Sequence, residues 1–302
     1  MKNKQTLGNL ALLITSIIWG TAFVFQRTAM LNIGPFSFAF VRMGIAAVLV
    51  GLVSFFVDKS AAKKNPQTPI RPFKKDLKGG IICGLALAVS SSAQQIGLQY
   101  TSASKGGFLT ALYILIVPIL SWVFLRRKVS AKTWLCVAGG AVGLYLLSIN
   151  GDFTIEKGDA WLLVCALGFA IQILCCDHFV KEGRPLRLSA LQFGVTSIIT
   201  FVLAMIFEQP HVSDYYVVIP SLLYCGILSG GLGYTLQMVG QKTANPTAAS
   251  LIMSFESVFA LVAGVLLLQE SVSLREGIGA AIMFAAVLLV QAPERKLKKQ
   301  SK

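Results

Sequence analysis

Glu256 stands near the middle of an apolar run, 246–268, that is long enough to cross a lipid bilayer. It lies about ten residues into the run, or roughly 15 Å at 1.5 Å per residue, close to the bilayer midplane. An ionised side chain at that depth costs about 2.5 to 3.5 kcal/mol, so it needs a partner or a proton. The positions on the same helical face are Ala249, Met253, Ala260 and Ala263. We therefore expect Glu256 to face other helices rather than lipid.

Two roles for Glu256 fit this position. In the first, the carboxyl group gains and loses a proton as a cavity alternates between the two sides of the membrane, which would couple transport to protons. In the second, it stays protonated or hydrogen-bonded and ties its helix to a neighbour. The sequence leaves both open.

Arg42 is the second ionisable residue inside an apolar run, 35–57. It lies seven residues from the start of the run, about 10 Å deep. A guanidinium there could bind a substrate carboxylate through two parallel hydrogen bonds. It could equally pack against carbonyl groups at a helix end and fix the topology. An ion pair with Glu256 is a third possibility.

Uncharged polar and aromatic residues in the other runs complete a candidate substrate site, because ligand pockets are mostly apolar with a few polar groups. Arg42 is one substrate-binding candidate, and Glu256 is the candidate coupling residue. The other substrate-binding candidates are Trp19, Gln94, Tyr113, Gln172, Gln192, Tyr234 and Gln237. Trp19 shares a helical face with Phe23 and Gln26, which predicts an aromatic wall or ordinary core packing.

The chain lacks the residue groupings of an enzyme or a metal site. His178 and His211 have no Ser, paired-Asp or His/Glu partner set, and the run Cys175–His178 has no second ligand cluster. No GxxxxGK[ST] loop is present, which argues against ATP-driven transport by this chain. We therefore expect no catalytic activity, metal or cofactor. The six cysteines all fall within apolar runs and predict no disulfide.

The elements that must position these residues are membrane helices. Of the 302 residues, 55% are hydrophobic and only 13% are charged, against about 25% charged in soluble domains. The apolar runs cover residues 8–27, 35–57, 79–98, 104–125, 132–149, 158–179, 186–207, 217–240, 246–268 and 274–291. We predict an all-α integral membrane protein with ten transmembrane helices.

The basic residues predict the orientation of these helices. With the N-terminus inside, 22 of the 27 Lys and Arg residues fall in inside segments. The outside loops hold Arg27, Lys105, Lys157 and Arg275, and Arg42 lies within a span. This asymmetry predicts a multi-pass protein of the cell membrane with both termini cytoplasmic. The net charge of +14 then reflects topology and attraction to anionic lipid, not nucleic-acid binding.

The two halves of the chain resemble each other. At an offset of 150 residues, PFSFAFVRMGIAAVL from Pro35 aligns with PLRLSALQFGVTSII from Pro185, which pairs Arg42 with Gln192. At an offset of 143, Gln94 aligns with Gln237 and Tyr113 with Glu256. We predict two five-helix repeats, 1–150 and 151–302. Because five is odd, the second has inverted topology, with the substrate site where the halves meet.

Several motifs carry a resemblance to a known family: IIWGTAF, PFSFAFVRM, LTALYILIVPIL and SLIMSFESVFALVAGVLLLQESVS, followed by Gly277. Their order resembles the drug/metabolite transporter superfamily, and within it the EamA family of ten-helix proteins with two repeats. Two positions depart from the family pattern. Ser257 replaces the usual proline after Glu256, which predicts a straighter helix. Arg127 replaces a usual acidic residue, while Glu270 is present at the second such position.

The resemblance implies export or uptake of small metabolites, with amino acids and related compounds a common class. The prediction is a secondary transporter that exports such a compound by alternating access. We expect it to contact the lipid bilayer and to use protons as the candidate coupling ion. We expect it to be a monomer or a homodimer. Two alternatives remain: a multidrug or cation exporter of the same fold, expected to have a carboxylate-dominated cavity without Arg42, and a non-transporting membrane scaffold.

Overall fold

A computed structural model describes residues 2–64, 73–101, 103–148, 157–268 and 273–291. In these residues the regular structure is helical, without strands. The first half contains α1 (Lys2–Ala29), α2 (Pro35–Lys64), α3 (Phe73–Gln99), α4 (Ala103–Ala111), α5 (Tyr113–Val123) and α6 (Ala131–Ser148). The second half contains α7 (Lys157–Val180), α8 (Pro185–Phe207), α9 (Val212–Val217), α10 (Ile219–Leu223), the π-helix η1 (Tyr224–Gly233), α11 (Tyr234–Gln241), α12 (Pro246–Met253), α13 (Glu256–Leu268) and α14 (Leu274–Gln291).

Each predicted apolar run is helical where it is described. In the described part of the chain, eight helical stretches are long and apolar enough to cross a membrane, and Ala131–Leu146 is a shorter apolar helix. The run 274–291 forms α14, which is not among these eight stretches. The number of ten membrane crossings therefore remains a prediction. Glu270 lies outside the described residues.

Three predicted helices are interrupted rather than continuous. The run 104–125 is divided into α4 and α5, and the run 246–268 into α12 and α13. The run 217–240 forms α10, η1 and α11.

The expectation that Ser257 straightens its helix is wrong. The helix breaks just before Glu256 without a proline there, where the backbone changes to tighter three-residue turns. Ser254 Oγ donates to the Leu251 carbonyl at 2.9 Å beside this break.

The helix boundaries repeat along the chain. Helices α4, α5 and α6 begin at residues 103, 113 and 131, and α12, α13 and α14 begin 143 residues later, at 246, 256 and 274. The two breaks also share their hydrogen bonds: Leu115 N donates to Leu112 O at 3.0 Å, and Val258 N to Phe255 O at 3.0 Å. The interruptions therefore belong to the repeat.

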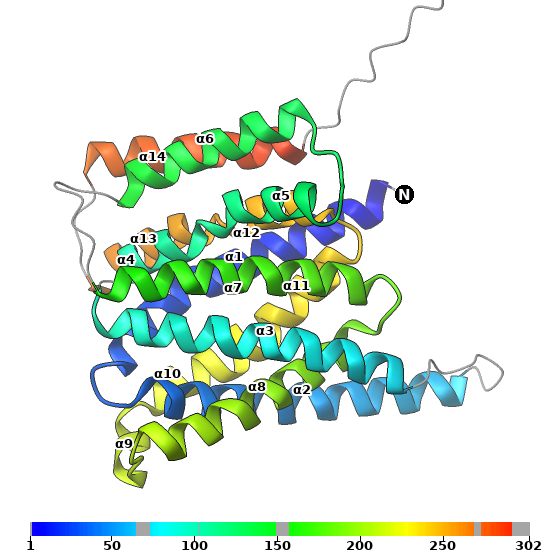
Figure 1. Cartoon of the computed structure of the whole chain (residues 1–302), viewed down its shortest axis with the longest axis vertical. Coiled ribbons are helices and arrows are strands. Elements are labelled where there is room, and N and C mark those ends of the chain that lie inside the picture. The colour runs from blue at the N-terminus through cyan, green and yellow to red at the C-terminus, as the bar shows by residue number, and fades with distance from the viewer. Residues whose placement is uncertain (1, 65–72, 102, 149–156, 269–272, 292–302) are drawn as a thin grey trace, which may run out of the picture.

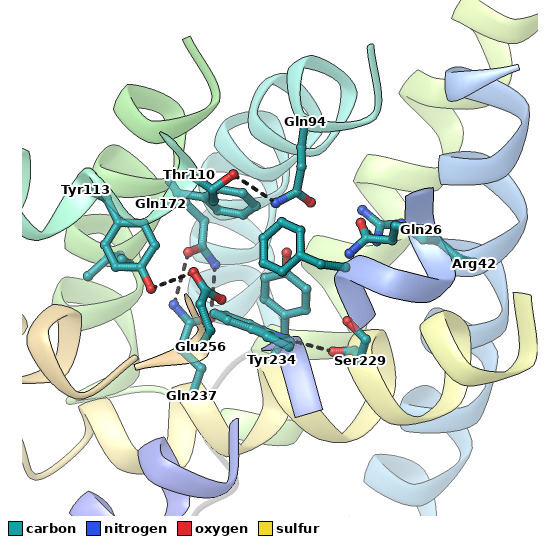
Figure 2. Close-up of a pocket in the computed structure, with 14 residues that line it drawn as sticks. Gln26, Arg42, Gln94, Thr110, Tyr113, Gln172, Ser229, Tyr234, Gln237 and Glu256 are labelled. Atoms are coloured by element: carbon teal, nitrogen blue, oxygen red, sulfur yellow. Dashed lines mark hydrogen bonds between the residues drawn. The ribbon is translucent and has the colours of Figure 1, made fainter. Parts of the chain in front are cut away.

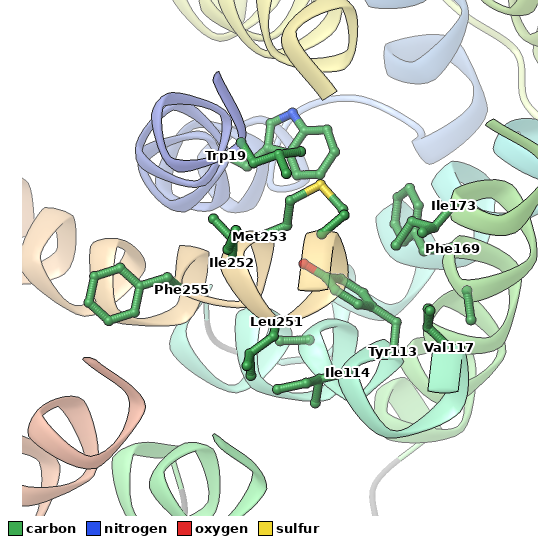
Figure 3. Packing of buried hydrophobic residues seen from close by; sticks show 14 of the residues in the cluster. Trp19, Tyr113, Ile114, Val117, Phe169, Ile173, Leu251, Ile252, Met253 and Phe255 are labelled. Carbon is green, nitrogen blue, oxygen red and sulfur yellow. The ribbon is translucent and has the colours of Figure 1, made fainter. Parts of the chain in front are cut away.

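The equivalent helices of the two halves pack together at opposite edges of the molecule. Figure 1 shows α6 beside α14 at one edge and α2 beside α8 at the other. Helix α1 lies between them and packs against α13, α11 and η1. Gly20 allows this close approach, because a Cβ atom there would lie 2.5 Å from the Glu256 carbonyl oxygen. Figure 3 shows side chains of α1, α5, α7 and α12 in one buried cluster, including Trp19, Ile114 and Leu251.

Candidate functional site

A narrow cavity lies where the two halves meet. Its lining comes from α1, α2, α3, α4, α5, α7, η1, α11 and α13. The lining residues are Trp19, Phe23, Gln26, Arg42, Gln94, Thr110, Tyr113, Phe169, Gln172, Ile173, Ser229, Tyr234, Gln237 and Glu256. Its free volume is about 20 Å³, which is room for about one water molecule. A metabolite can enter only after the surrounding helices move apart.

The structure brings eight of the nine sequence candidates to this cavity. Gln192 is the exception: it is fully buried behind the wall, where its Oε1 accepts a hydrogen bond from Gln172 Nε2 at 3.3 Å. Thr110, Phe169, Ile173 and Ser229 also line the cavity and were not among the candidates. Thr110 lies one turn before Tyr113, a spacing that could have indicated it. Ser229 is on the π-helix, whose register the apolar pattern does not show.

Glu256 is 2% exposed and is hydrogen-bonded across the repeat interface. Tyr113 Oη donates to its Oε1 at 3.0 Å. Tyr113 is the first residue of α5 and Glu256 the first of α13, so one bond joins the two helix breaks. The partial positive charge of a helix N-terminus also favours a carboxylate at this position.

Arg42 is likewise 2% exposed, on the opposite side of the cavity from Glu256 (Figure 2). Its Nη1 donates to Gln26 Oε1 at 2.9 Å, and its guanidinium lies 5.7 Å from the centre of the Phe38 ring. In the described residues, Arg42 Nε and Nη2 have no hydrogen-bond partner. No ion pair within 4.0 Å joins Arg42 to Glu256, so the described structure rejects that possibility. Both of these Arg42 donors are buried.

Amide side chains form hydrogen bonds at two levels of the cavity. Gln237 Nε2 donates to Gln172 Oε1 at 3.1 Å. Gln94, the predicted counterpart of Gln237, donates to Thr110 Oγ1 at 3.5 Å. These weak, exchangeable bonds can be replaced by bonds to a polar substrate.

Two polar layers related by the repeat bracket the cavity. In the first half, Arg42 bonds to Gln26, which also accepts a bond from Gln95. At an offset of 150 the equivalent pair is Gln192 and Cys176, whose Sγ lies 3.9 Å from Gln192 Oε1. The same two positions are therefore in contact in both halves, but only the first-half layer is charged.

Aromatic side chains form the apolar wall between these layers. Trp19 Nε1 donates to the Ser229 carbonyl at 3.2 Å, and the Trp19 and Tyr234 rings lie 4.6 Å apart. This bond fixes the indole against η1, and Trp19 lines the cavity. Among the described residues, no group of three His, Cys, Asp or Glu side chains is placed to hold a metal ion.

Comparisons with known proteins agree with this architecture. The model of the EamA-like transporter family matches residues 6–149 and again residues 156–292. An uncharacterized transporter of Archaeoglobus fulgidus is 30% identical over 95% of this chain and 86% of its own length. The uncharacterized transporter YoaV of Bacillus subtilis is 23% identical over 93% and 95% of the two chains.

A plant protein and a solved structure extend the similarity. A WAT1-related chloroplastic protein of Arabidopsis thaliana is 24% identical over 91% of this chain and 67% of its own. One crystal structure shares the fold, with a TM-score of 0.71, 14% identity and coverage of 96% and 97%. Because the family model matches both halves of this multi-pass membrane chain, the protein belongs to the EamA-like transporter family.

Proposed function

We propose that this protein is a secondary transporter that exports a small organic metabolite, an amino acid or a related compound, by alternating access. One observation carries the proposal. Two buried side chains of opposite charge type, Arg42 and Glu256, line the same cavity without pairing with each other. Keeping both groups buried is costly unless a ligand or a proton interacts with them.

The contacts support a role for each group in this proposal. The free Nε and Nη2 donors of Arg42 bind the carboxylate of the substrate. Glu256 carries the coupling proton, and Tyr113 Oη holds it in position. The amides of Gln94, Gln172 and Gln237 bind polar atoms, while Trp19 and Tyr234 contact the apolar part.

The two polar layers act as the gates of this cycle. When the Gln26–Arg42–Gln95 contacts open, the cavity meets the side predicted to be outside. When the contacts of Gln192 with Cys176 and Gln172 open, it meets the side predicted to be inside. The closed cavity of about 20 Å³ fits the intermediate between these states.

Arg42 in the cavity wall supports a carboxylate-bearing metabolite over a cationic drug. A guanidinium disfavours a cationic ligand by repulsion, and a site built to bind an anion rejects a ligand that lacks one. A non-transporting scaffold gives no reason for the unused donors of Arg42.

Exchange in proteoliposomes tests the proposal. Vesicles loaded with unlabelled amino acids and related metabolites are given each labelled compound outside, and exchange is compared for wild type, Arg42→Gln and Arg275→Gln. Arg275 lies on α14 outside the cavity lining and is the charge-matched control. We expect one compound class to exchange, Arg275→Gln to match wild type, and Arg42→Gln to raise KM at least tenfold. Exchange of hydrophobic cations alone would reject the metabolite class, and no exchange by wild type would reject transport.

A further inference from the structure

A groove on the lipid-facing surface has the form of a phospholipid site. It lies between α5 and α7, which pack against each other (Figure 1), and has a volume of about 620 Å³. Its lining is almost entirely apolar, including Leu120 of α5, Phe124 directly after α5, and Leu167 and Ile171 of α7. Phe124 is 75% exposed, so this apolar surface has no cover from the described chain.

The length of the groove matches one leaflet of a bilayer. Along α7 it runs from Leu167 to His178, eleven residues or about 16 Å of helix. Half of a hydrocarbon core of about 30 Å is about 15 Å. An acyl chain of one leaflet therefore fits the groove from end to end.

The polar end of the groove is basic. Arg127 and His178 line it there, and each also lines a neighbouring hollow. Arg127 shares one with Lys128, and His178 shares the other with Lys75, Lys78 and Glu182. Asp177 is fully buried and pairs with both Arg127, at 2.6 Å, and Lys181, at 3.0 Å. One carboxylate between two cations leaves a net positive charge. In the two neighbouring hollows Lys128, Lys75 and Lys78 outnumber Glu182, so this end of the groove is basic.

We propose that this groove binds an anionic phospholipid, with one acyl chain along α5 and α7 and the phosphate at Arg127 and His178. Basic pockets between membrane helices bind anionic headgroups through the same chemistry. An apolar groove without this charged end would accept any lipid. The bound lipid also places a phosphate beside the ion pair of Asp177. The neighbouring Cys176 contacts Gln172 of the cavity lining and Gln192 behind it.

Photocrosslinking from inside the groove tests this site independently of transport. A benzophenone amino acid replaces Ile171 in the groove or, as control, Leu163, which is 47% exposed on the same helix but outside it. Each protein is irradiated in vesicles of phosphatidylcholine with a minor fraction of phosphatidylglycerol, and the attached lipids are identified by mass spectrometry. We expect phosphatidylglycerol to be enriched severalfold at position 171 over its bilayer share, and not at position 163.

Two variants separate recognition from folding. His178→Gln leaves the Arg127–Asp177 pair intact and should lower the enrichment at position 171, and Arg127→Gln with His178→Gln should abolish it. Lys59→Gln, a basic residue on α2 outside the groove, should change nothing. Lipids attached in bilayer proportion at both positions would overturn the proposal, and so would crosslinks to a second protein chain in place of lipid.

Discussion

At the scale of single residues, the bond between Tyr113 and Glu256 separates the two roles that the sequence allows for the carboxyl group. It joins the first residues of α5 and α13 at 3.0 Å, as a structural tie would. Yet hydrogen bonds between membrane helices are worth only about 0.6 kcal/mol on average. A bond of that size is too weak to justify burying an ionisable group for stability alone.

A double-mutant cycle measures this bond. We expect Tyr113→Phe, Glu256→Gln and the double variant to give a coupling energy of about 0.6 kcal/mol in reversible unfolding, and no more than about 1.7 kcal/mol, because both ends of the bond sit in a membrane interior. A coupling of several kcal/mol would instead make Glu256 chiefly a structural residue.

The sequence predicted the residues of the cavity better than their contacts. Depth in an apolar run identified Glu256 and Arg42, and the repeat paired Gln94 with Gln237. The sequence could not predict which neighbour each side chain contacts, because that depends on how each helix is rotated about its own axis. Gln192 therefore lies behind the wall, and Ser229, on the π-helix η1, lines the cavity.

At the scale of helices, the apolar runs located the membrane segments but not their ends or breaks. Helix α2 continues from the predicted end at 57 to Lys64, since polar residues outside the hydrocarbon remain helical. The breaks before Tyr113 and Glu256 escaped prediction because neither contains a proline. In the sequence, the two breaks are related only by the repeat, which places both at the same position of equivalent helices, 143 residues apart.

The contact of α1 with the second break makes a sharp prediction. Gly20→Ala would place a Cβ atom 2.5 Å from the Glu256 carbonyl oxygen and 2.8 Å from Ala260 N. Since backbone cannot yield as a flexible side chain does, we expect a loss of about 1 to 3 kcal/mol of stability and slower transport.

Gly194→Ala is the matched control, because no atom lies within 4 Å of its Cβ position. It should be neutral or slightly stabilising in a melting experiment, as alanine favours a helix. Equal melting temperatures and fluxes for the two variants would contradict the close packing of α1 on α13.

At the scale of the whole molecule, the inverted orientation of the two halves remains a prediction from the basic residues. Tyr100 and Thr243 are equivalent at the offset of 143 and both are exposed. We expect Tyr100→Cys to react with a membrane-impermeant maleimide in intact cells, and Thr243→Cys to react only after permeabilisation. The native cysteines are buried or partly buried and should give little background. Labelling of both sites from the same side would contradict the inverted topology.

The central claim is that a proton carried by Glu256 couples transport through this cavity to a pH gradient. The most direct measurement is accumulation of the exchanged compound in proteoliposomes with and without a pH gradient, for wild type, Glu256→Gln and the control Glu276→Gln on α14. The account predicts gradient-driven accumulation by wild type and Glu276→Gln, while Glu256→Gln retains exchange but no longer accumulates substrate. Accumulation by Glu256→Gln equal to that of wild type would contradict it and leave Glu256 as a tie between α13 and α5.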